Sequence, residues 1–207
     1  MFVKICGIKS LEELEIVEKY ANATGVVVEC ESKRRITLEK AREIIECANI
    51  PVFVVSTLTD LNAWMRVIEK TQAEYIQIHA EVSPDLVGKV KELDIKVMKA
   101  FRVPRLSENP ERDAKSLIEK IELYDVDLIL LDTGKGSGLI HDHRVSRIVA
   151  KEFDIILAGG LNPQNVAKIV EFVKPFGVDV SSGVEKNGRK DEKLVTDFVR
   201  EVRRFES

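Results

Sequence analysis

The chain has few residues that could cross-link it covalently or through a metal ion. Its 207 residues include only 3 Cys and 3 His, and no two cysteines form a Cys-x-x-Cys pair. An odd number of cysteines at these spacings argues against a disulfide framework and against a zinc site. Because free thiols are typical of reducing compartments, we expect a cytoplasmic protein.

Long apolar runs and blocks of one charge are also missing. No apolar run approaches the roughly 18 residues that a membrane span needs, so we expect no membrane association. The formal net charge is -3 and no basic block dominates, which gives little support to nucleic-acid binding. Hydrophobic residues make up 44% of the chain, enough for a large core, and the length suits one domain over residues 1–207.

Apolar, β-branched runs recur along the chain at a spacing of roughly 25 residues, with amphipathic helical patterns between them. Their nearly continuous hydrophobicity is typical of parallel strands covered on both faces. Eight such β-α units predict an α/β fold, a closed (β/α)8 TIM barrel. The alternative is an open doubly wound sheet, but the chain lacks the Gly-x-Gly-x-x-Gly after the first strand that is typical of that fold. The runs are residues 2–5, 24–28, 51–55, 74–78, 96–101, 126–131, 155–158 and 177–180.

Several helix boundaries can also be predicted. Ser10 with Glu13 forms a capping-box pattern, and Thr37 and Asp60 are suitable N-caps for the next helices. Pro163 is expected at the first position of a helix, and Cys47 is expected in the core.

Two strands end in groups that could transfer protons. The first runs into Cys6 and Gly7, and the sixth runs into Asp132. Because the carboxyl ends of parallel barrel strands share one rim, the thiol and the carboxyl are expected to face one cavity. Such a pair suggests a base and an acid.

The last two strands carry a pattern typical of phosphate binding. The seventh runs into Gly159 and Gly160, and the eighth runs into Ser181, Ser182 and Gly183. Glycine lets the backbone approach an anion, and exposed N–H groups at a helix start donate to it. These residues therefore predict a phosphate site, although each turn alone could be an ordinary β-α connection.

Segments spread over almost the whole chain resemble the phosphoribosylanthranilate isomerase family of tryptophan biosynthesis. The resemblance implies a cofactor-free aldose–ketose isomerisation, the Amadori rearrangement of N-(5-phosphoribosyl)anthranilate to 1-(2-carboxyphenylamino)-1-deoxyribulose 5-phosphate. It therefore implies a small phosphosugar–anthranilate substrate and a monomer or homodimer. The matching segments are residues 3–8, 32–34, 77–79, 130–133, 136–138, 158–166 and 178–185.

The resemblance also implies roles for single residues. Asp132 matches the family's catalytic aspartate and Cys6 its catalytic cysteine, which we interpret as general acid and general base. Arg34 matches the arginine that binds the anthranilate carboxylate, although a basic loop of this kind could simply be solvated. Lys4, two residues before Cys6 on the same strand face, could favour the thiolate.

Other residues allow more than one interpretation. His79 ends the fourth strand and is expected to line the substrate site. Asp179 could bind a ribose hydroxyl or only orient its loop. Residues 134–138 are rich in glycine and predict a mobile lid over the substrate. His141 and His143 look like metal ligands, but no third ligand is evident, and we expect no metal there.

Three other functions are compatible with such a barrel. A related aminoaldose isomerase would be expected to carry an aspartate in place of Cys6, and a pentulose-phosphate epimerase would need metal-binding side chains on several strands. A catalytically silent phosphosugar-binding barrel would keep the glycine and serine turns but would not need both Cys6 and Asp132.

Overall fold

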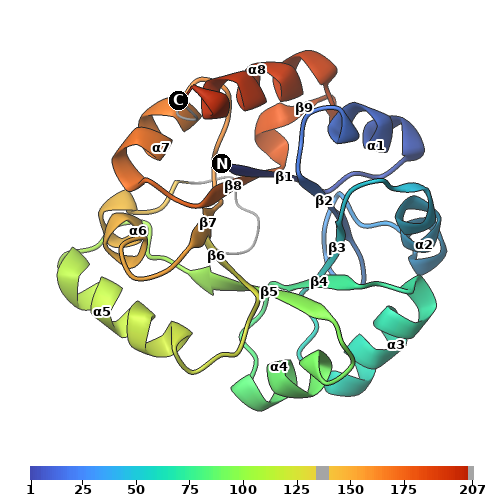
Figure 1. Ribbon diagram of the computed structural model, residues 1–207, viewed down its shortest axis with the longest axis horizontal. Coiled ribbons are helices and arrows are strands. Elements are labelled where there is room, and N and C mark those ends of the chain that lie inside the picture. The colour runs from blue at the N-terminus through green and yellow to red at the C-terminus, as the bar shows by residue number, and fades with distance from the viewer. Residues whose placement is uncertain (134–139, 205–207) are drawn as a thin grey trace.

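Eight parallel strands close into a barrel in the computed structural model, which describes residues 1–133 and 140–204 (Figure 1). The strands follow one another around the barrel in chain order, and β1 pairs with both β2 and β8. They are β1 (Phe2–Cys6), β2 (Ala23–Val27), β3 (Val52–Ser56), β4 (Tyr75–Ile78), β5 (Lys96–Arg102), β6 (Leu128–Asp132), β7 (Ile155–Leu157) and β8 (Gly177–Val180).

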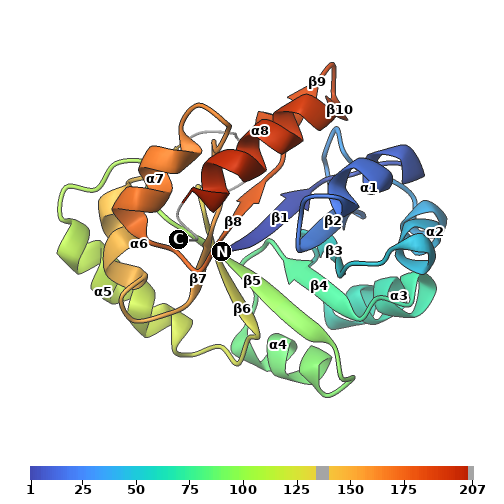
Figure 2. The same ribbon diagram turned by 45° about the horizontal axis from the view of Figure 1, so that its top comes forward.

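Helices follow the strands and form an outer ring around the barrel (Figures 1 and 2). After β8 the chain adds a 3-10 turn and a small antiparallel hairpin of β9 and β10 before the last helix. These elements are α1 (Leu11–Glu18), α2 (Leu38–Cys47), α3 (Leu61–Thr71), α4 (Pro84–Lys91), α5 (Pro110–Ile121), α6 (His143–Val149), α7 (Val166–Val173), η1 (Ser182–Val184), β9 (Glu185–Lys186), β10 (Arg189–Lys190) and α8 (Glu192–Arg203).

The predicted fold class is confirmed. Each apolar run overlaps one barrel strand, and the pairing of β1 with β8 closes the sheet, which excludes the open doubly wound alternative. Each strand is short, and its side chains alternate between two buried environments, as expected for a parallel sheet enclosed by helices.

Two apolar clusters occupy the two faces of the barrel wall. The larger one lies between the strands and the helices and includes Val3 and Ile5 of β1. The smaller one fills the barrel interior. Its buried members are Cys6, Ala23, Val27, Phe53, Val55, Met98, Ala100, Leu130, Ile156 and Ala158.

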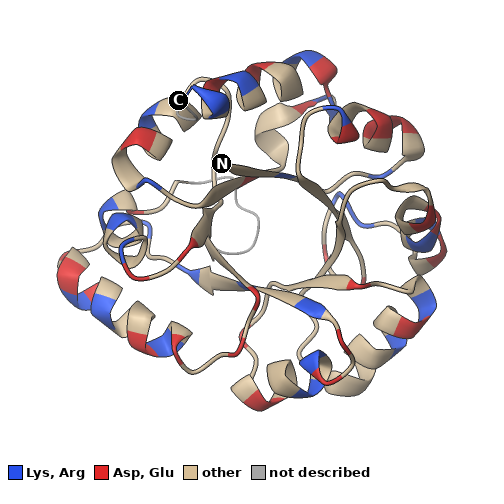
Figure 3. Ribbon diagram, viewed as in Figure 1, with Lys and Arg blue, Asp and Glu red and all other residues tan. Residues whose placement is uncertain are grey.

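Charged residues lie mostly on the outer helices, whereas the strands carry few of them (Figure 3). Some of the charged residues on the strands are buried, and their burial is costly. They include Lys4, Lys99, Asp132 and Asp179, each less than a tenth exposed. Burial of a charge is tolerated only with compensating partners, so these positions mark either function or an energetic cost.

The predicted helix caps are confirmed at Ser10, Thr37 and Asp60, whose side chains accept N–H groups of the first helical turn. The capping box differs in one detail, because the Glu13 carboxylate accepts the backbone N–H of Lys9 at 2.6 Å. It also accepts the N–H of Lys190 at 2.8 Å, which ties α1 to the hairpin.

Two local predictions were wrong. Pro163 does not start a helix, because the Asn162 side chain accepts the N–H groups of Gln164 and Asn165 and holds these residues in a turn. The helix begins only at Val166. Cys47 is exposed rather than buried, since it is the last residue of α2 and does not face the barrel.

Lys99 is a buried cation that the proposed chemistry does not need. It shares its strand face with Val97 and Phe101, which point toward the helix layer, and its ammonium donates to the Ala100 carbonyl at 2.6 Å. The Nζ atom also lies 4.8 Å from the centre of the Phe101 ring. These contacts do not compensate for burial, which lowers the pKa of Lys99 to about 8.

We predict that Lys99→Met raises the free energy of unfolding by roughly 1 kcal/mol at pH 7, because it removes a poorly compensated buried charge. The folded pKa lies below the unfolded one, so the unfolded chain binds more protons between about pH 8 and pH 10.5. The advantage of the variant should therefore shrink as the pH rises through this window. Urea titrations at pH 7 and pH 10.5 measure the difference in the free energy of unfolding between the variant and the wild type.

Lys96→Met, an exposed change on the same strand, serves as the control and should have little effect. A Lys99→Met variant that is less stable than the wild type at both pH values would show that the carbonyl and ring contacts of the ammonium outweigh its desolvation.

Candidate active site

The structure places Cys6 and Asp132 at the same rim of the barrel and on the same face of the wall. Cys6 is the last residue of β1 and belongs to the interior cluster. Asp132 is the last residue of β6, and it shares its strand face with Leu130, which is also interior. Both are buried, at 7% and 6% exposure. The predicted convergence of the thiol and the carboxyl on one cavity mouth is therefore consistent with the alternation of both strands.

A buried ion pair lies directly below Cys6. Lys4 Nζ donates to Asp179 Oδ1 at 3.0 Å, across the seam at which β1 and β8 pair. Burial alone would lower the pKa of Lys4, but the attraction of Asp179 and Cys6 raises it above its ordinary value, so the amine stays charged. Burial pushes the pKa of Asp179 upward against the attraction of Lys4. We take the ionised pair as the form at neutral pH because the two charged groups are in direct contact.

The electrostatics of Cys6 follow from this arrangement. Burial raises the pKa of the Cys6 thiol above its usual value, while the positive charges of Lys4 and Lys190 act in the opposite direction. In the free protein the sulfur is therefore protonated at neutral pH. Lys4 and Lys190, which oppose the effect of burial on this pKa, are fixed in place. They therefore also stabilise any negative charge that develops on the sulfur.

Asp132 is linked to the predicted lining residue His79. The His79 Nε2 atom lies 3.1 Å from Asp132 Oδ2, and Gln77 Nε2 lies 3.4 Å from His79 Nδ1. Asp179 is close enough to Asp132 and His79 for both to influence its pKa. The Lys4–Asp179 pair and the His79–Asp132 pair therefore interact electrostatically.

Arg34 lies in a tight turn after β2 that the sequence itself stabilises. Its backbone N–H donates to the Ser32 hydroxyl, and Arg35 pairs with Val27 beyond the turn. The Arg34 stem passes over Gly7, where a Cβ atom would collide with Arg34 Cδ. Gly7 also has a positive φ of 81°, so glycine serves both the turn and the arginine.

The Arg34 guanidinium does not project freely into solvent. Its Nε donates to Glu185 Oε1 at 2.6 Å and its Nη2 donates to Glu185 Oε2 at 3.0 Å. Lys190 Nζ donates to the same carboxylate at 2.8 Å. Burial would raise the pKa of Glu185, but the bonds from Arg34 and Lys190 lower it to about 2.

The turns predicted to bind phosphate lie against each other. Gly159 and Gly160 both have positive φ after β7. Gly183 lies so close to this turn that a Cβ atom would overlap the backbone carbonyl of Leu161. The two strand ends therefore form one continuous backbone surface beside Cys6, as a phosphate cradle requires.

Ser181 connects this surface to the first strand. Its hydroxyl donates to the Cys6 carbonyl at 2.8 Å, and Lys190 Nζ donates to the Ser181 carbonyl at 3.1 Å. The hydroxyl is thus engaged within the protein. The roles of Gly159, Gly160, Ser181, Ser182 and Gly183 toward a phosphate remain predictions.

The His141-Asp142-His143 segment is explained by packing and capping. The two imidazole rings lie edge to face, with centres 4.9 Å apart, and His141 Nε2 lies 2.7 Å from Ser146 Oγ. Burial lowers the pKa of His141 to about 4, so this ring is neutral at pH 7. Asp142 caps α6 and binds Arg144. Among residues 1–133 and 140–204, no three His, Cys, Asp or Glu side chains are grouped as metal ligands.

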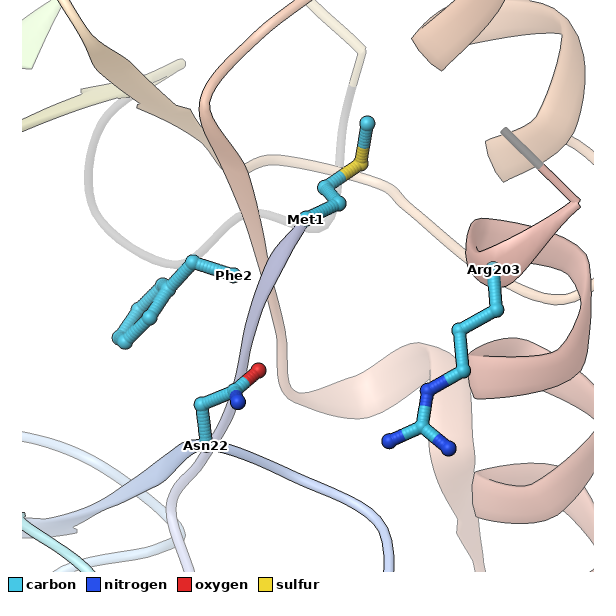
Figure 4. Close-up of a pocket in the computed structure, with 4 residues that line it drawn as sticks. All are labelled: Met1, Phe2, Asn22 and Arg203. Carbon is cyan, nitrogen blue, oxygen red and sulfur yellow. The ribbon is translucent and has the colours of Figure 1, made fainter. Parts of the chain in front are cut away.

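Two hollows lie away from Cys6 and Asp132. One, of about 450 Å³, is lined by residues around His141 and by Arg105, Lys168 and Phe172. The other, of about 480 Å³, lies at the amino-terminal end of the barrel beside Met1, Phe2, Asn22 and Arg203 (Figure 4). Its position at the end of the barrel opposite the carboxyl ends of the strands separates it from the candidate site.

Sequence reasoning missed three contributors to the site. Lys190 lies in a segment that gave no signal, and Gln77 lay within a segment that resembles the family but was assigned no role. Glu185 lay within a segment that resembles the family, but its contact with Arg34 spans 151 residues of sequence. The predicted lid, residues 134–138, lies outside the described residues.

A closed parallel barrel with a thiol and a carboxyl at its carboxyl rim, beside two adjoining glycine-rich turns, is typical of a TIM-barrel enzyme. A family model described as N-(5'phosphoribosyl)anthranilate (PRA) isomerase matches residues 3–201. The chain belongs to this family, as the resemblance predicted.

Individual relatives agree with this assignment. The isomerase of Pyrococcus abyssi is 62% identical over 204 residues, which cover 98% of each chain. The structure of the Pyrococcus furiosus isomerase has a TM-score of 0.94 at 57% identity and covers 99% of each chain. A Thermotoga maritima isomerase in complex with reduced 1-(o-carboxyphenylamino)-1-deoxyribulose 5-phosphate has a TM-score of 0.80 at 34% identity, covering 99% of this chain and 100% of that one.

We predict that Gly183→Ala separates the two turns of the cradle. The added Cβ would overlap the Leu161 carbonyl, so the free energy of unfolding should fall by about 1–3 kcal/mol. We also expect phosphate to raise the melting temperature of the wild type but not that of the variant. Thermal unfolding with and without phosphate measures both effects.

Gly88→Ala is the matched control, because a Cβ there meets nothing within 4 Å. In the middle of α4 this change should be neutral or stabilising by up to about 1 kcal/mol. Equal stability of the two alanine variants would contradict the close approach of the two turns.

Proposed function

We propose that the rim site carries out the Amadori rearrangement of N-(5-phosphoribosyl)anthranilate in tryptophan biosynthesis with Asp132 as general acid and Cys6 as general base. The observation that carries this assignment is the placement of both groups on the interior face of one rim, beside the turns of β7 and β8. The reaction needs an acid and a base on one substrate, and no cofactor enters it.

The first step opens the sugar ring. Asp132 in its protonated form gives its proton to the furanose oxygen while the bond from C1′ to that oxygen breaks, and the anthranilate nitrogen lone pair forms the Schiff base. Asp132 is then a carboxylate. His79 at 3.1 Å stabilises it by donating from Nε2, and Gln77 donates to Nδ1 of this tautomer.

The protonated form of Asp132 can use the same two partners. The Oε1 atom of Gln77 is buried and has no partner among the described residues. Rotation of the amide would bring this oxygen to His79 Nδ1, which would then carry the proton. His79 Nε2 would accept from the protonated Asp132. The relay therefore supports the acid before the step and the carboxylate after it.

The second step forms the ketone. The Cys6 thiolate takes the proton from C2′, the electron pair moves to form an enolamine, and tautomerisation of the enolamine gives the product. The active form needs a thiolate at Cys6 and a proton on Asp132. This form and the form with a Cys6 thiol and an Asp132 carboxylate differ only in which of the two residues holds the proton. Lys4 stabilises the thiolate in the active form.

The remaining site residues position the substrate. We assign the anthranilate carboxylate to Arg34 and the phosphate to Gly159, Gly160, Ser181, Ser182 and Gly183. Asp179 fixes Lys4 and lines the rim together with His79, which favours an orienting role over a chemical one.

The setting of the protein is also part of this proposal. The three cysteines are free, which suits a reducing cytoplasm. None of the helices among the described residues is both long and apolar enough to traverse a bilayer. Residues 1–207 act as one domain in a monomer or a homodimer.

The test follows the fluorescence loss of N-(5-phosphoribosyl)anthranilate for the wild type, Cys6→Ser and Asp132→Asn. Serine cannot provide a base near neutral pH and asparagine cannot give a carboxylic proton. Each change should therefore lower kcat by about 10²–10⁴-fold with little change in KM. Wild-type inactivity in a folded sample would refute the function, and a loss of less than about tenfold in either variant would refute the role of that residue.

A further inference from the structure

The hairpin of β9 and β10 is tight and places two charged side chains near Arg34. Its turn residues Asn187 and Gly188 have φ angles of 53° and 73°, as a two-residue type I′ turn requires. In this register Lys190 lies directly opposite Glu185. Lys190 is also held by its backbone N–H, which donates to Glu13 on α1.

The carboxylate of Glu185 occupies only one edge of the Arg34 guanidinium. It accepts from Nε and from Nη2, which uses two of the five N–H donors of arginine. Two of the remaining three donors, one on Nη1 and one on Nη2, form a second edge of the group. That edge has the spacing that accepts a second carboxylate in bidentate fashion.

Lys190 decides the net charge of this group. Arg34 and Lys190 are positive and Glu185 is negative, so the three side chains together carry one positive charge. Without Lys190, Glu185 would neutralise Arg34. The Lys190 side chain is fully buried and is in contact with both Glu185 and Ser181, so its charge is fixed in position.

We propose that Glu185 and Lys190 are positioning residues for recognition of the substrate carboxylate. Glu185 holds the Nε–Nη2 edge so that Arg34 presents its other edge to the anthranilate carboxyl group, and Lys190 keeps the group net positive. This inference rests on the proposed function, since it takes Arg34 as the partner of that carboxylate. The short hairpin thus makes the barrel selective for an aryl amine that carries a carboxylate.

The experiment compares two substrates that differ only in this carboxylate: N-(5-phosphoribosyl)anthranilate and N-(5-phosphoribosyl)aniline. Glu185→Gln should raise KM for the first by about tenfold, with kcat changed by less than about threefold. It should leave kcat/KM for the aniline compound unchanged. A merely structural role of Glu185 would lower kcat/KM for both substrates alike, and that result would overturn the proposal.

Removal of charges within the group gives a second test. Lys190→Met should raise KM for the anthranilate compound more than Glu185→Gln does, because the unopposed Glu185 neutralises Arg34. The double variant Glu185→Gln/Lys190→Met regains the net positive charge, because Arg34 is then unopposed. It should bind the anthranilate compound better than Lys190→Met alone. A double variant that is no better than Lys190→Met would contradict the charge argument.

Lys186→Met, an exposed change on the same hairpin, is the matched control. It should not alter the ratio of kcat/KM for the anthranilate compound to kcat/KM for the aniline compound. Arg34→Ala should abolish the preference for the carboxylate. An inactive wild type, or an Arg34→Ala variant with the preference intact, would refute the proposed function and this inference with it. If the wild type is active and Arg34→Ala loses the preference, but Glu185→Gln leaves KM for the anthranilate compound unchanged, only this inference is refuted.

Discussion

The ion pair between Lys4 and Asp179 is the interaction on which the candidate site depends. It joins the first and last strands where the barrel closes, and both side chains are almost completely buried. Buried ion pairs add little net stability, because desolvation cancels most of the attraction. Its value in this fold is therefore electrostatic: it fixes a positive charge two residues from Cys6, on the same face of β1, where burial alone would keep the thiol protonated.

The rest of the rim repeats this arrangement, in which a carboxylate holds a cation in place. Asp179 holds Lys4, and Glu185 holds both Arg34 and Lys190. Each carboxylate lies in a segment far from its main partner in the chain, so the barrel must close before the site exists. Fixed charges need not reorganise during the reaction, and preorganisation of this kind is the largest single source of catalysis in many enzymes.

Much of the fold could be predicted because it depends on local pattern. Apolar runs of strand length alternating with amphipathic helices predicted the barrel, and strand-end positions brought out Cys6 and Asp132. The contacts of Lys4 with Asp179 and of Arg34 with Glu185 could not be predicted, because they depend on strand register and loop path over 175 and 151 residues. Local errors had local causes: the side chain of Asn162 delayed a helix, and the end of α2 left Cys47 exposed.

The most direct test of the electrostatic account is the ionisation of Cys6, followed by thiolate absorbance in a protein whose other cysteines, Cys30 and Cys47, are replaced by alanine. In this background Lys4→Met should raise the apparent pKa of Cys6. The double variant Lys4→Met/Asp179→Asn should raise it by less, because Asp179 opposes Lys4 at the sulfur. An unchanged or lower pKa in a folded Lys4→Met protein would contradict the account.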